Sequence, residues 1–457
     1  MKKSLVILSL SLASIFQANA VVVHQPNQKI EQGLNTFGAG IANWEEQHLG
    51  AYTYPDAHLF HKHAIIEHGD KMPLKLTAPI ELSNHHVFAG NQSMDLYAFM
   101  RDRANIHNYV VMTKDGTIIA EDYWNGTNTK TKNHLMSASK SFTSMVLAIA
   151  VEKGFISYND KIEKWIPEFK HSPLAGQPLR NFSDMRSGIR TIDSKYDDDN
   201  GYHWSMGEWS TWDWAMPLAS GYNGFDTLDG KVINKSGAHG RLDGIEEFLK
   251  ILANKVKPVA PGVGYNYKCV NTEIIGLSAE RAIAAATGMS FNAFMEQELW
   301  KKGGFQEPVA AFLDLNHDRM PYSGGLNMTT RDFAIAMNLI ANEGKNFKGE
   351  QILPLSFIER LRNGDDAVKQ AWKFTDNQEQ VAGEGFYADQ FRTISLNGRP
   401  ISAMVGVNGQ WNVIDWNTGT TVSIFSSFGK PSGPSMIATF FTAIDALFTL
   451  ADQHSKK

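Results

Sequence analysis

The chain has 457 residues, a net charge of −5 and a single cysteine. This length is ample for a large buried core, and one cysteine excludes an intrachain disulfide. Acidic and basic residues are interspersed, without the basic stripe of a nucleic-acid-binding protein or the polybasic patch of a membrane-surface protein, so we expect no nucleic-acid partner.

The first 20 residues have the pattern of a secretory signal peptide. Lys2 and Lys3 precede an apolar run over 5–16, and the small residues around Ala18 and Ala20 resemble a cleavage site. The run is too short for a stable membrane anchor. We therefore expect cleavage after Ala20, export to a periplasm or the medium, and no membrane anchor in the mature protein.

Residues 21–100 show few strong hydrophobic periods and are predicted to be an N-terminal extension that wraps the body. It contains a cluster of possible metal ligands: Asp56, His58, His61, His63 and His68. They do not form an H-E-x-x-H pattern, and the sequence gives no third metal ligand at a defined spacing. We favour a surface or structural role over an adventitious metal site, and we assign no metal and no cofactor.

The stretch from Asn108 to Trp124 predicts a β-hairpin, with strands at 109–112 and 117–120 around a Lys-Asp-Gly turn. A helix is predicted directly after it, and Gly154 is placed to end this helix. Its apolar residues form one stripe: Phe142, Met145, Val146, Ile149 and Ala150.

Ser137 and Lys140 stand three residues apart at the start of this helix, so their Cβ atoms are expected roughly 5–6 Å apart on one face. The helix dipole favours an alkoxide there and disfavours a protonated lysine, so an uncharged Lys140 could take the Ser137 proton. Ser137 is thus a candidate covalent nucleophile. The alternative is an N-cap serine followed by a lysine on a solvated face.

Helical patterns dominate from about 158 to 316, for example at 245–255 and 272–287. Strands are predicted near 390–396, 403–407 and 421–425, and 436–450 is predicted to be a helix that closes over the sheet. A cluster of aromatic residues either lines an apolar substrate cleft or forms the core of an inserted lobe. Its members are Tyr202, Trp204, Trp209, Trp212 and Trp214.

Together these elements predict an α/β fold with a mainly helical lobe. The expected division is a signal peptide at 1–20, an N-terminal extension at 21–100, an α/β body formed by 101–157 and 317–457, and the helical lobe at 158–316.

Further motifs follow the S-x-x-K pattern of Ser137 and Lys140 in a recognisable order. They are an M-x-S-G turn within 183–189, a segment at 261–273 with Tyr267 as its tyrosine, and a G-G-L-x-x-T-x-R-D pattern within 323–332. The chain therefore resembles the serine β-lactamase and penicillin-binding-protein superfamily. It looks most similar to the branch of 6-aminohexanoate-dimer hydrolases and related class C β-lactamase-like esterases and amidases.

The resemblance implies an antiparallel sheet flanked by helices, with the site in a cleft beside the helical lobe. It also implies two-step acyl transfer, in which Ser137 attacks a carbonyl while Lys140 and Tyr267 act as one hydrogen-bonded unit. Which of the two is the base stays open. The backbone N–H groups of Ser137 and Val407 would hold the oxyanion. The alternative for Tyr267 is a core aromatic.

Two departures from the family pattern bear on the substrate. Cys269 stands where an asparagine often binds a substrate amide, and we expect this lone thiol to be inert. No K-T-G is present, and the best match is the G-x-x-G-Q of residues 406–410. Residues 417–419 imitate K-T-G, but their flanking strands predict the tight turn of a hairpin.

The sequence thus predicts a secreted serine hydrolase that cleaves a small-molecule ester or amide without a cofactor. A first alternative is a β-lactamase or D-alanyl peptidase, which Cys269 and the missing K-T-G argue against. A second is a catalytically silent binding protein on the same fold, against which the combination of Ser137, Lys140 and Tyr267 argues.

Overall fold

The computed structural model describes residues 21–41, 43–46, 48–189, 222, 226–228, 231–233, 244–256, 258–314, 317–374 and 383–455. The expected signal peptide and the tryptophan group at 204–214 lie outside the described residues, so both expectations stay predictions.

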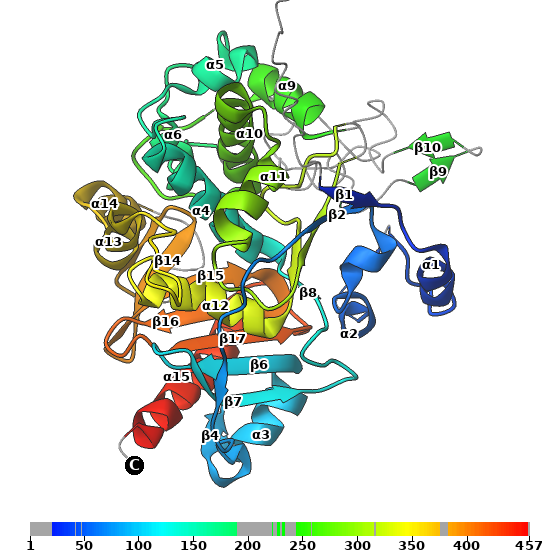
Figure 1. Cartoon of the computed structure of the whole chain (residues 1–457), viewed down its shortest axis with the longest axis vertical. Coiled ribbons are helices and arrows are strands. Elements are labelled where there is room, and N and C mark those ends of the chain that lie inside the picture. Colours follow the sequence, from blue (N-terminus) through cyan, green and yellow to red (C-terminus); the bar gives the residue numbers. More distant parts are fainter. Residues whose placement is uncertain are drawn as a thin grey trace, which may run out of the picture.

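A large sheet forms the centre of the molecule (Figure 1). Its strand order is β13-β14-β15-β16-β17-β6-β7-β3, and all neighbours are antiparallel except β3 and β7. In that order the bounds are Gly385–Ala388, Phe391–Leu396, Arg399–Gly406, Gln410–Asp415, Thr421–Ser426, Ile106–Met112, Thr117–Tyr123 and Lys75–Leu76. The predicted antiparallel sheet is confirmed, and so are the early hairpin (β6 and β7) and the three later strands (β14, β15 and β17).

A second sheet joins the N-terminal extension to the centre of the chain, in the order β1-β2-β11-β12-β8. The bounds are Val22–His24, His63–Ile66, Val309–Phe312, Leu326–Met328 and Asn133–His134. Because β8 directly precedes Ser137, its pairing with β12 brings the segment around 326 beside the candidate nucleophile. Two short hairpins are separate: β4 (His86–Ala89) with β5 (Gln92–Asp95), and β9 (Asp226–Leu228) with β10 (Lys231–Ile233).

Both faces of the large sheet are covered by helices (Figure 1). Side chains alternate along a strand, so Val110 and Ile414 enter one hydrophobic core while their neighbours Val111 and Val413 enter the other. α12 (Thr330–Ala341) covers the first face and α15 (Pro434–His454) the second. The sheet is therefore the middle layer of three.

The C-terminal helix α15 confirms the helix predicted at 436–450. By length and composition alone it is apolar enough to cross a membrane. Its residues Phe440, Ile444 and Leu447 are buried in the core beneath the sheet, which is how a core helix of a folded domain behaves.

Helices gather beside the sheet to form the described part of the lobe (Figure 1). α10 (Cys269–Thr287) packs along α4 (Ser139–Glu152), and α5 (Ile162–Trp165), α6 (Leu179–Ser183), α9 (Ile245–Lys255) and α11 (Phe291–Met295) surround it. α9 matches its predicted range, whereas α10 begins three residues before the predicted start at 272. The other α-helices of the described residues are α1 (Gln28–Asn35), α2 (Gly50–Thr53), α3 (Leu96–Ala98), α13 (Leu355–Asn363) and α14 (Asp366–Lys373).

The single apolar stripe predicted for α4 was too narrow. Every residue from Ser139 to Ala150 is buried, because α10, the sheet and the 321–328 segment enclose the helix. Its end was predicted correctly, since Gly154 takes the left-handed conformation with a φ of 73°.

The contact between α10 and Tyr322 depends on a glycine, and Gly276→Ala is expected to destabilise the protein by about 1–3 kcal/mol. An alanine Cβ at this position would lie 2.1 Å from Tyr322 Cγ. This overlap outweighs the gain in helix propensity, which is at most about 1 kcal/mol. Denaturant unfolding checks the result. Gly33→Ala is the matched control, because Gly33 lies in α1 with nothing within 4 Å of an added Cβ; equal stability of the two variants would refute the packing argument.

Candidate active site

Ser137 lies in a tight turn that leads into α4. Residues Met136–Ala138 form the 3₁₀ turn η4, and α4 begins at Ser139. Met136 has a φ of 51°, a left-handed conformation that residues other than glycine rarely adopt. Ser137 is partly exposed, while both of its neighbours are buried. The turn therefore presents the serine at the end of a buried helix, open to a substrate.

Lys140 points back to this serine from the first turn of α4. Its Nζ donates a hydrogen bond of 2.9 Å to Ser137 Oγ and another of 2.9 Å to the carbonyl of Ser323. Only 1% of Lys140 is exposed, which excludes the alternative of a lysine on a solvated face. The predicted proximity of Ser137 and Lys140 is confirmed.

Tyr267 comes from the loop before α10 and closes the other side of Lys140. Lys140 Nζ lies 5.2 Å from the centre of the Tyr267 ring, and the two side chains are hydrogen-bonded. Tyr267 is partly exposed. The structure thus brings Ser137, Lys140 and Tyr267 together as the sequence predicts.

The turn at 183–189 supports the loop that carries Tyr267. The backbone N–H groups of Val259, Gly262 and Asn266 donate to carbonyls of this turn, at 2.8, 2.7 and 2.9 Å. Gly188 has a φ of 79°, and a Cβ there would lie 2.6 Å from the carbonyl oxygen of Val259. Close approach of the two segments therefore requires a glycine in the M-x-S-G motif.

The pKa of Lys140 is raised above its usual value, whereas the sequence predicts an uncharged amine. Burial acts to lower this pKa. Cys269 and Tyr267 outweigh burial, because both side chains hydrogen-bond Lys140 and attract its positive charge when they are ionised. Lys140 is therefore held as an ammonium at neutral pH. The expectation from the helix dipole was wrong, because it left out two groups from a segment remote in sequence.

The contact of the 322–326 segment with Lys140 was missed by sequence reasoning, although the motif within 323–332 was recognised. The backbone of residues 322–326 runs along α4 and is hydrogen-bonded to three polar side chains of that helix. Ser139 Oγ accepts from the N–H of Leu326 at 3.2 Å, Lys140 donates to Ser323, and Thr143 Oγ1 donates to the Tyr322 carbonyl at 2.7 Å. The available signal was the set of hydroxyl residues in α4, which is unusual for a buried helix.

The end of β15 adjoins the Ser137 turn. A Cβ on Gly406 would lie 2.4 Å from the Leu135 carbonyl oxygen and 2.9 Å from Met136 Cβ, so only glycine permits this contact. Val407 follows directly and begins the short turn η9 (Val407–Gly409), which connects β15 to β16. The backbone of Val407 therefore starts at the edge of the candidate site.

The two remaining motif assignments are also placed. Residues 417–419 lie in the turn between β16 and β17, where Asp415 Oδ1 accepts from the Asn417 N–H at 2.9 Å. The prediction that this K-T-G look-alike is a hairpin turn is confirmed. Cys269 is half-buried at the start of α10, and its side chain is hydrogen-bonded to Lys140.

The sequence matches a family model over most of its length. The model, described as Beta-lactamase, covers residues 98–439. The chain belongs to the β-lactamase family. Members of this family are serine hydrolases that act on ester or amide bonds, so the protein is a serine hydrolase of this family.

Known proteins similar to this β-lactamase family member fall into two sets. In sequence, penicillin-binding protein 4* of Bacillus subtilis (strain 168) is 36% identical over 55 residues, which is 12% of each chain. In structure, a Bacillus anthracis protein assigned as a 6-aminohexanoate-dimer hydrolase aligns over 94% of this chain and 99% of its own, with a TM-score of 0.74 and 21% identity.

Two other structures share the β-lactamase fold. The octameric penicillin-binding protein homologue from Pyrococcus abyssi covers 78% of this chain and 77% of its own, with a TM-score of 0.54 and 15% identity. EstCE1, a hydrolase with promiscuous acyltransferase activity, covers 77% and 96%, with a TM-score of 0.53 and 14% identity. At these identities the likeness concerns the fold.

The histidine cluster of the extension is structural in this family member. His58, His61 and His63 are buried, and burial lowers the pKa of His61 to about 4. His61 contacts the carbonyls of Ala57 and Tyr222 at 2.8 and 3.0 Å. Within the described ranges, no group of three or more His, Cys, Asp or Glu side chains is arranged to hold a metal ion.

A buried ionic network behind the Tyr267 loop was also missed by sequence reasoning. Arg360 donates to Asp184 Oδ1 at 2.8 Å and to Asp389 Oδ2 at 2.7 Å, and Arg180 pairs with Asp389 at 2.6 Å. Burial acts to raise the pKa of Asp389, but the two arginines lower it. The network ties the 183–189 turn to the sheet. Asp184 and Arg360 are 176 residues apart in sequence, so no local pattern connects them.

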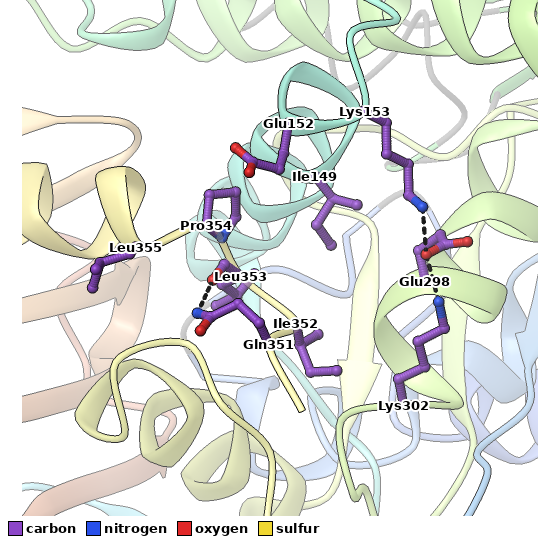
Figure 2. Close-up of a pocket in the computed structure, with 10 residues that line it drawn as sticks. All are labelled: Ile149, Glu152, Lys153, Glu298, Lys302, Gln351, Ile352, Leu353, Pro354 and Leu355. Atoms are coloured by element: carbon purple, nitrogen blue, oxygen red, sulfur yellow. Dashed lines mark hydrogen bonds and ion pairs between the residues drawn. The ribbon is translucent and has the colours of Figure 1, made fainter. Parts of the chain in front are cut away.

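A cavity of about 350 Å³ lies at the opposite end of α4 (Figure 2). At its rim, Glu298 forms ion pairs with Lys153 and Lys302 at 3.1 and 2.6 Å. An α-helix rises 1.5 Å per residue, so this cavity lies roughly 15–20 Å from Lys140 along α4. It is therefore separate from the candidate active site.

Proposed function

We propose that this protein hydrolyses small-molecule esters or amides through an acyl-enzyme on Ser137. The observation that carries the proposal is the 2.9 Å hydrogen bond from Lys140 Nζ to Ser137 Oγ, with Tyr267 against the same ammonium. A partly exposed hydroxyl held against groups that take its proton and stabilise its charge is the arrangement of covalent acyl transfer.

Tyr267 is the proposed base. Lys140 enters as an ammonium because its pKa is raised, so it stabilises negative charge and does not accept the proton. The Tyr267 oxygen takes the proton as Ser137 Oγ forms a bond to the substrate carbonyl carbon. Collapse of the tetrahedral intermediate then breaks the bond to the leaving alcohol or amine, which receives the proton from Tyr267. Water then attacks the carbonyl of the acyl-enzyme, with Tyr267 again transferring the proton, which releases the acid and restores Ser137.

The oxyanion is assigned to the backbone N–H groups of Ser137 and Val407. The close packing of Gly406 on Leu135 and Met136 supports this assignment, because it sets the start of Val407 beside the serine turn. Losing one such donor typically costs about a hundredfold or more in rate.

We propose linear esters and small amides as the substrate class. The side chain of Cys269 is hydrogen-bonded to Lys140, and it stands where the family often has an asparagine. A thiol is a weak donor and acceptor compared with a carboxamide, so this position lacks the group that binds a substrate amide in β-lactam-cleaving relatives. The fold shared with the Bacillus anthracis protein assigned as a 6-aminohexanoate-dimer hydrolase supports the same choice.

Intact-mass analysis after a fluorophosphonate probe tests the proposal, with turnover of a p-nitrophenyl ester, 6-aminohexanoate dimer and benzylpenicillin followed in parallel. We expect one adduct, and turnover of the ester or the linear amide. A stable penicillin adduct on Ser137 would favour the β-lactamase or D-alanyl peptidase alternative. Absence of any adduct in folded protein would favour a silent binding protein.

We also propose that the protein is exported. The charged, apolar and small-residue segments of 1–20 support this proposal. Expression with the leader in a bacterial host is expected to yield a mature protein that begins at Val21 in the periplasm or the medium, as measured by intact mass. Full-length protein in the cytoplasm, with Ala20→Arg behaving identically, would contradict export.

A further inference from the structure

Glu273 is a buried acid that the proposed mechanism leaves unused. It lies on α10 one turn after Cys269, and its side chain is completely buried. Its two carboxylate oxygens accept from two consecutive backbone N–H groups, of Ser323 at 2.9 Å and of Tyr322 at 3.2 Å. A buried carboxylate with both oxygens bound to backbone holds that backbone in one position.

The backbone that Glu273 holds is the one that holds Lys140. The Ser323 carbonyl accepts from Lys140 Nζ at 2.9 Å, and the same ammonium donates to Ser137 Oγ. Glu273 also lies close enough for the Lys140 charge to act on its pKa. The chain of contacts therefore runs from Glu273 through Ser323 to Lys140 and then to Ser137.

We propose that Glu273 is a positioning residue for the Lys140 ammonium, acting through the backbone of Tyr322 and Ser323 and as its buried counter-charge. The inference rests on the proposed function, because it concerns the rate at which Ser137 is acylated. A buried ammonium needs a fixed acceptor and a nearby negative charge. Glu273 fixes the acceptor, which is the Ser323 carbonyl, and provides a negative charge.

The proposal has a consequence for pH. Burial raises the pKa of Glu273 to about 7, although its bonds to Ser323 and the charge of Lys140 oppose this effect. As the pH falls through this value, the carboxylate takes a proton, and Lys140 loses the negative charge of Glu273. Acylation is therefore expected to slow on the acid side of neutrality.

The groups that face Glu273 do not supply the same titration. Lys140 and Tyr322 have pKa values raised above their usual ranges, so neither changes charge near neutral pH. His134, which is hydrogen-bonded to the backbone of Gly324, has its pKa lowered by burial to about 3. Glu280, on the same helix, accepts from the Tyr322 hydroxyl and lies farther along α10.

The matched control is Asp332, a second buried carboxylate that is bound to two consecutive backbone N–H groups and also accepts from the Thr329 hydroxyl. It is completely buried on α12, accepts from the backbone N–H groups of Gln306 and Glu307, and has its pKa raised by burial to about 6. A purely structural role would therefore affect Glu273→Gln and Asp332→Asn in the same way.

The experiment measures the acylation rate of mature protein with p-nitrophenyl acetate, from about pH 5 to about pH 9, for wild type, Glu273→Gln and Asp332→Asn. Wild type and Asp332→Asn are expected to share an acid limb with an apparent pKa near 7. In Glu273→Gln the limb disappears, and acylation at alkaline pH falls by about tenfold or more with KM little changed.

Thermal unfolding over the same pH range separates positioning from stability. Because the folded-state pKa of Glu273 lies above the usual value of 4.5, the stability of wild type relative to Glu273→Gln falls as the pH rises to about 7 and is constant above it. Asp332→Asn shows the same trend without the change in acylation.

A folded Glu273→Gln variant with the wild-type acid limb and rate would overturn the inference. If that variant does not fold, a wild-type acylation rate that stays constant from pH 8 to about pH 5.5 would overturn it as well. Failure of the proposed function is distinct, because wild type itself would then show no acylation of Ser137.

Discussion

Replacing Ser137 with alanine is expected to lower ester and amide turnover by about a thousandfold or more and to abolish the fluorophosphonate adduct. In the proposed mechanism Ser137 Oγ forms the bond to the acyl group, and alanine has no atom that replaces it. Because Ser137 is partly exposed, the alanine variant affects one buried polar group, the Lys140 ammonium. This ammonium loses its bond to the serine hydroxyl but keeps its bond to the Ser323 carbonyl. The variant should therefore remain folded.

Ser144→Ala is the matched control for this prediction. Ser144 lies on the same helix, is completely buried, and its hydroxyl has no hydrogen-bond partner among the described residues. Its removal is expected to change neither labelling nor turnover. Residual labelling of Ser137→Ala at the wild-type rate would place the nucleophile elsewhere and contradict the assignment.

Lys140→Met is expected to slow acylation by about 10²- to 10⁴-fold. Methionine keeps an unbranched chain of similar length in the buried space but removes the charge. Ser137 then loses the ammonium that lies 2.9 Å from its oxygen, and Tyr267 loses one of the two cations at its ring, because Arg392 stays 4.7 Å from the ring centre. Stopped-flow measurement of the p-nitrophenol burst reports the acylation step directly.

Lys153→Met tests whether a lysine on α4 matters in general. Lys153 lies at the far end of the same helix, where it pairs with Glu298 beside the cavity (Figure 2). This variant is expected to acylate at the wild-type rate, since exposed ion pairs contribute little to stability. Acylation by Lys140→Met within about twofold of wild type would show that the ammonium is not part of the machinery.

The elements that the sequence predicts well are those determined by local contacts. The hairpin of β6 and β7 follows from alternating apolar residues around a Lys-Asp-Gly turn, and α9 follows from one apolar face. The pairing of β12 with β8 was not predictable, because both strands are short and lie far apart in sequence. The burial of α4 on all sides has the same origin, since its neighbours come from distant segments.

The candidate site also contains contacts that the sequence predicts and contacts that it does not. Ser137 and Lys140 are three residues apart, so helical geometry alone brings them together. Their contact with Tyr267 was predicted from the resemblance to a family. The Ser323 carbonyl, 183 residues from Lys140, and the carboxylate of Glu273 lie at the edges of recognised motifs, but no local pattern predicts their contacts around the lysine.

The sequence by itself determined the nucleophile candidate, its lysine partner, the order of the motifs and the class of the fold, because each depends on neighbours within one turn of helix or one hairpin, or on a recognisable pattern. Only the tertiary structure decided the charge of Lys140 and the position of Glu273. Protonation depends on burial and on charges from every segment packed around the group, and those segments meet only when the chain is folded.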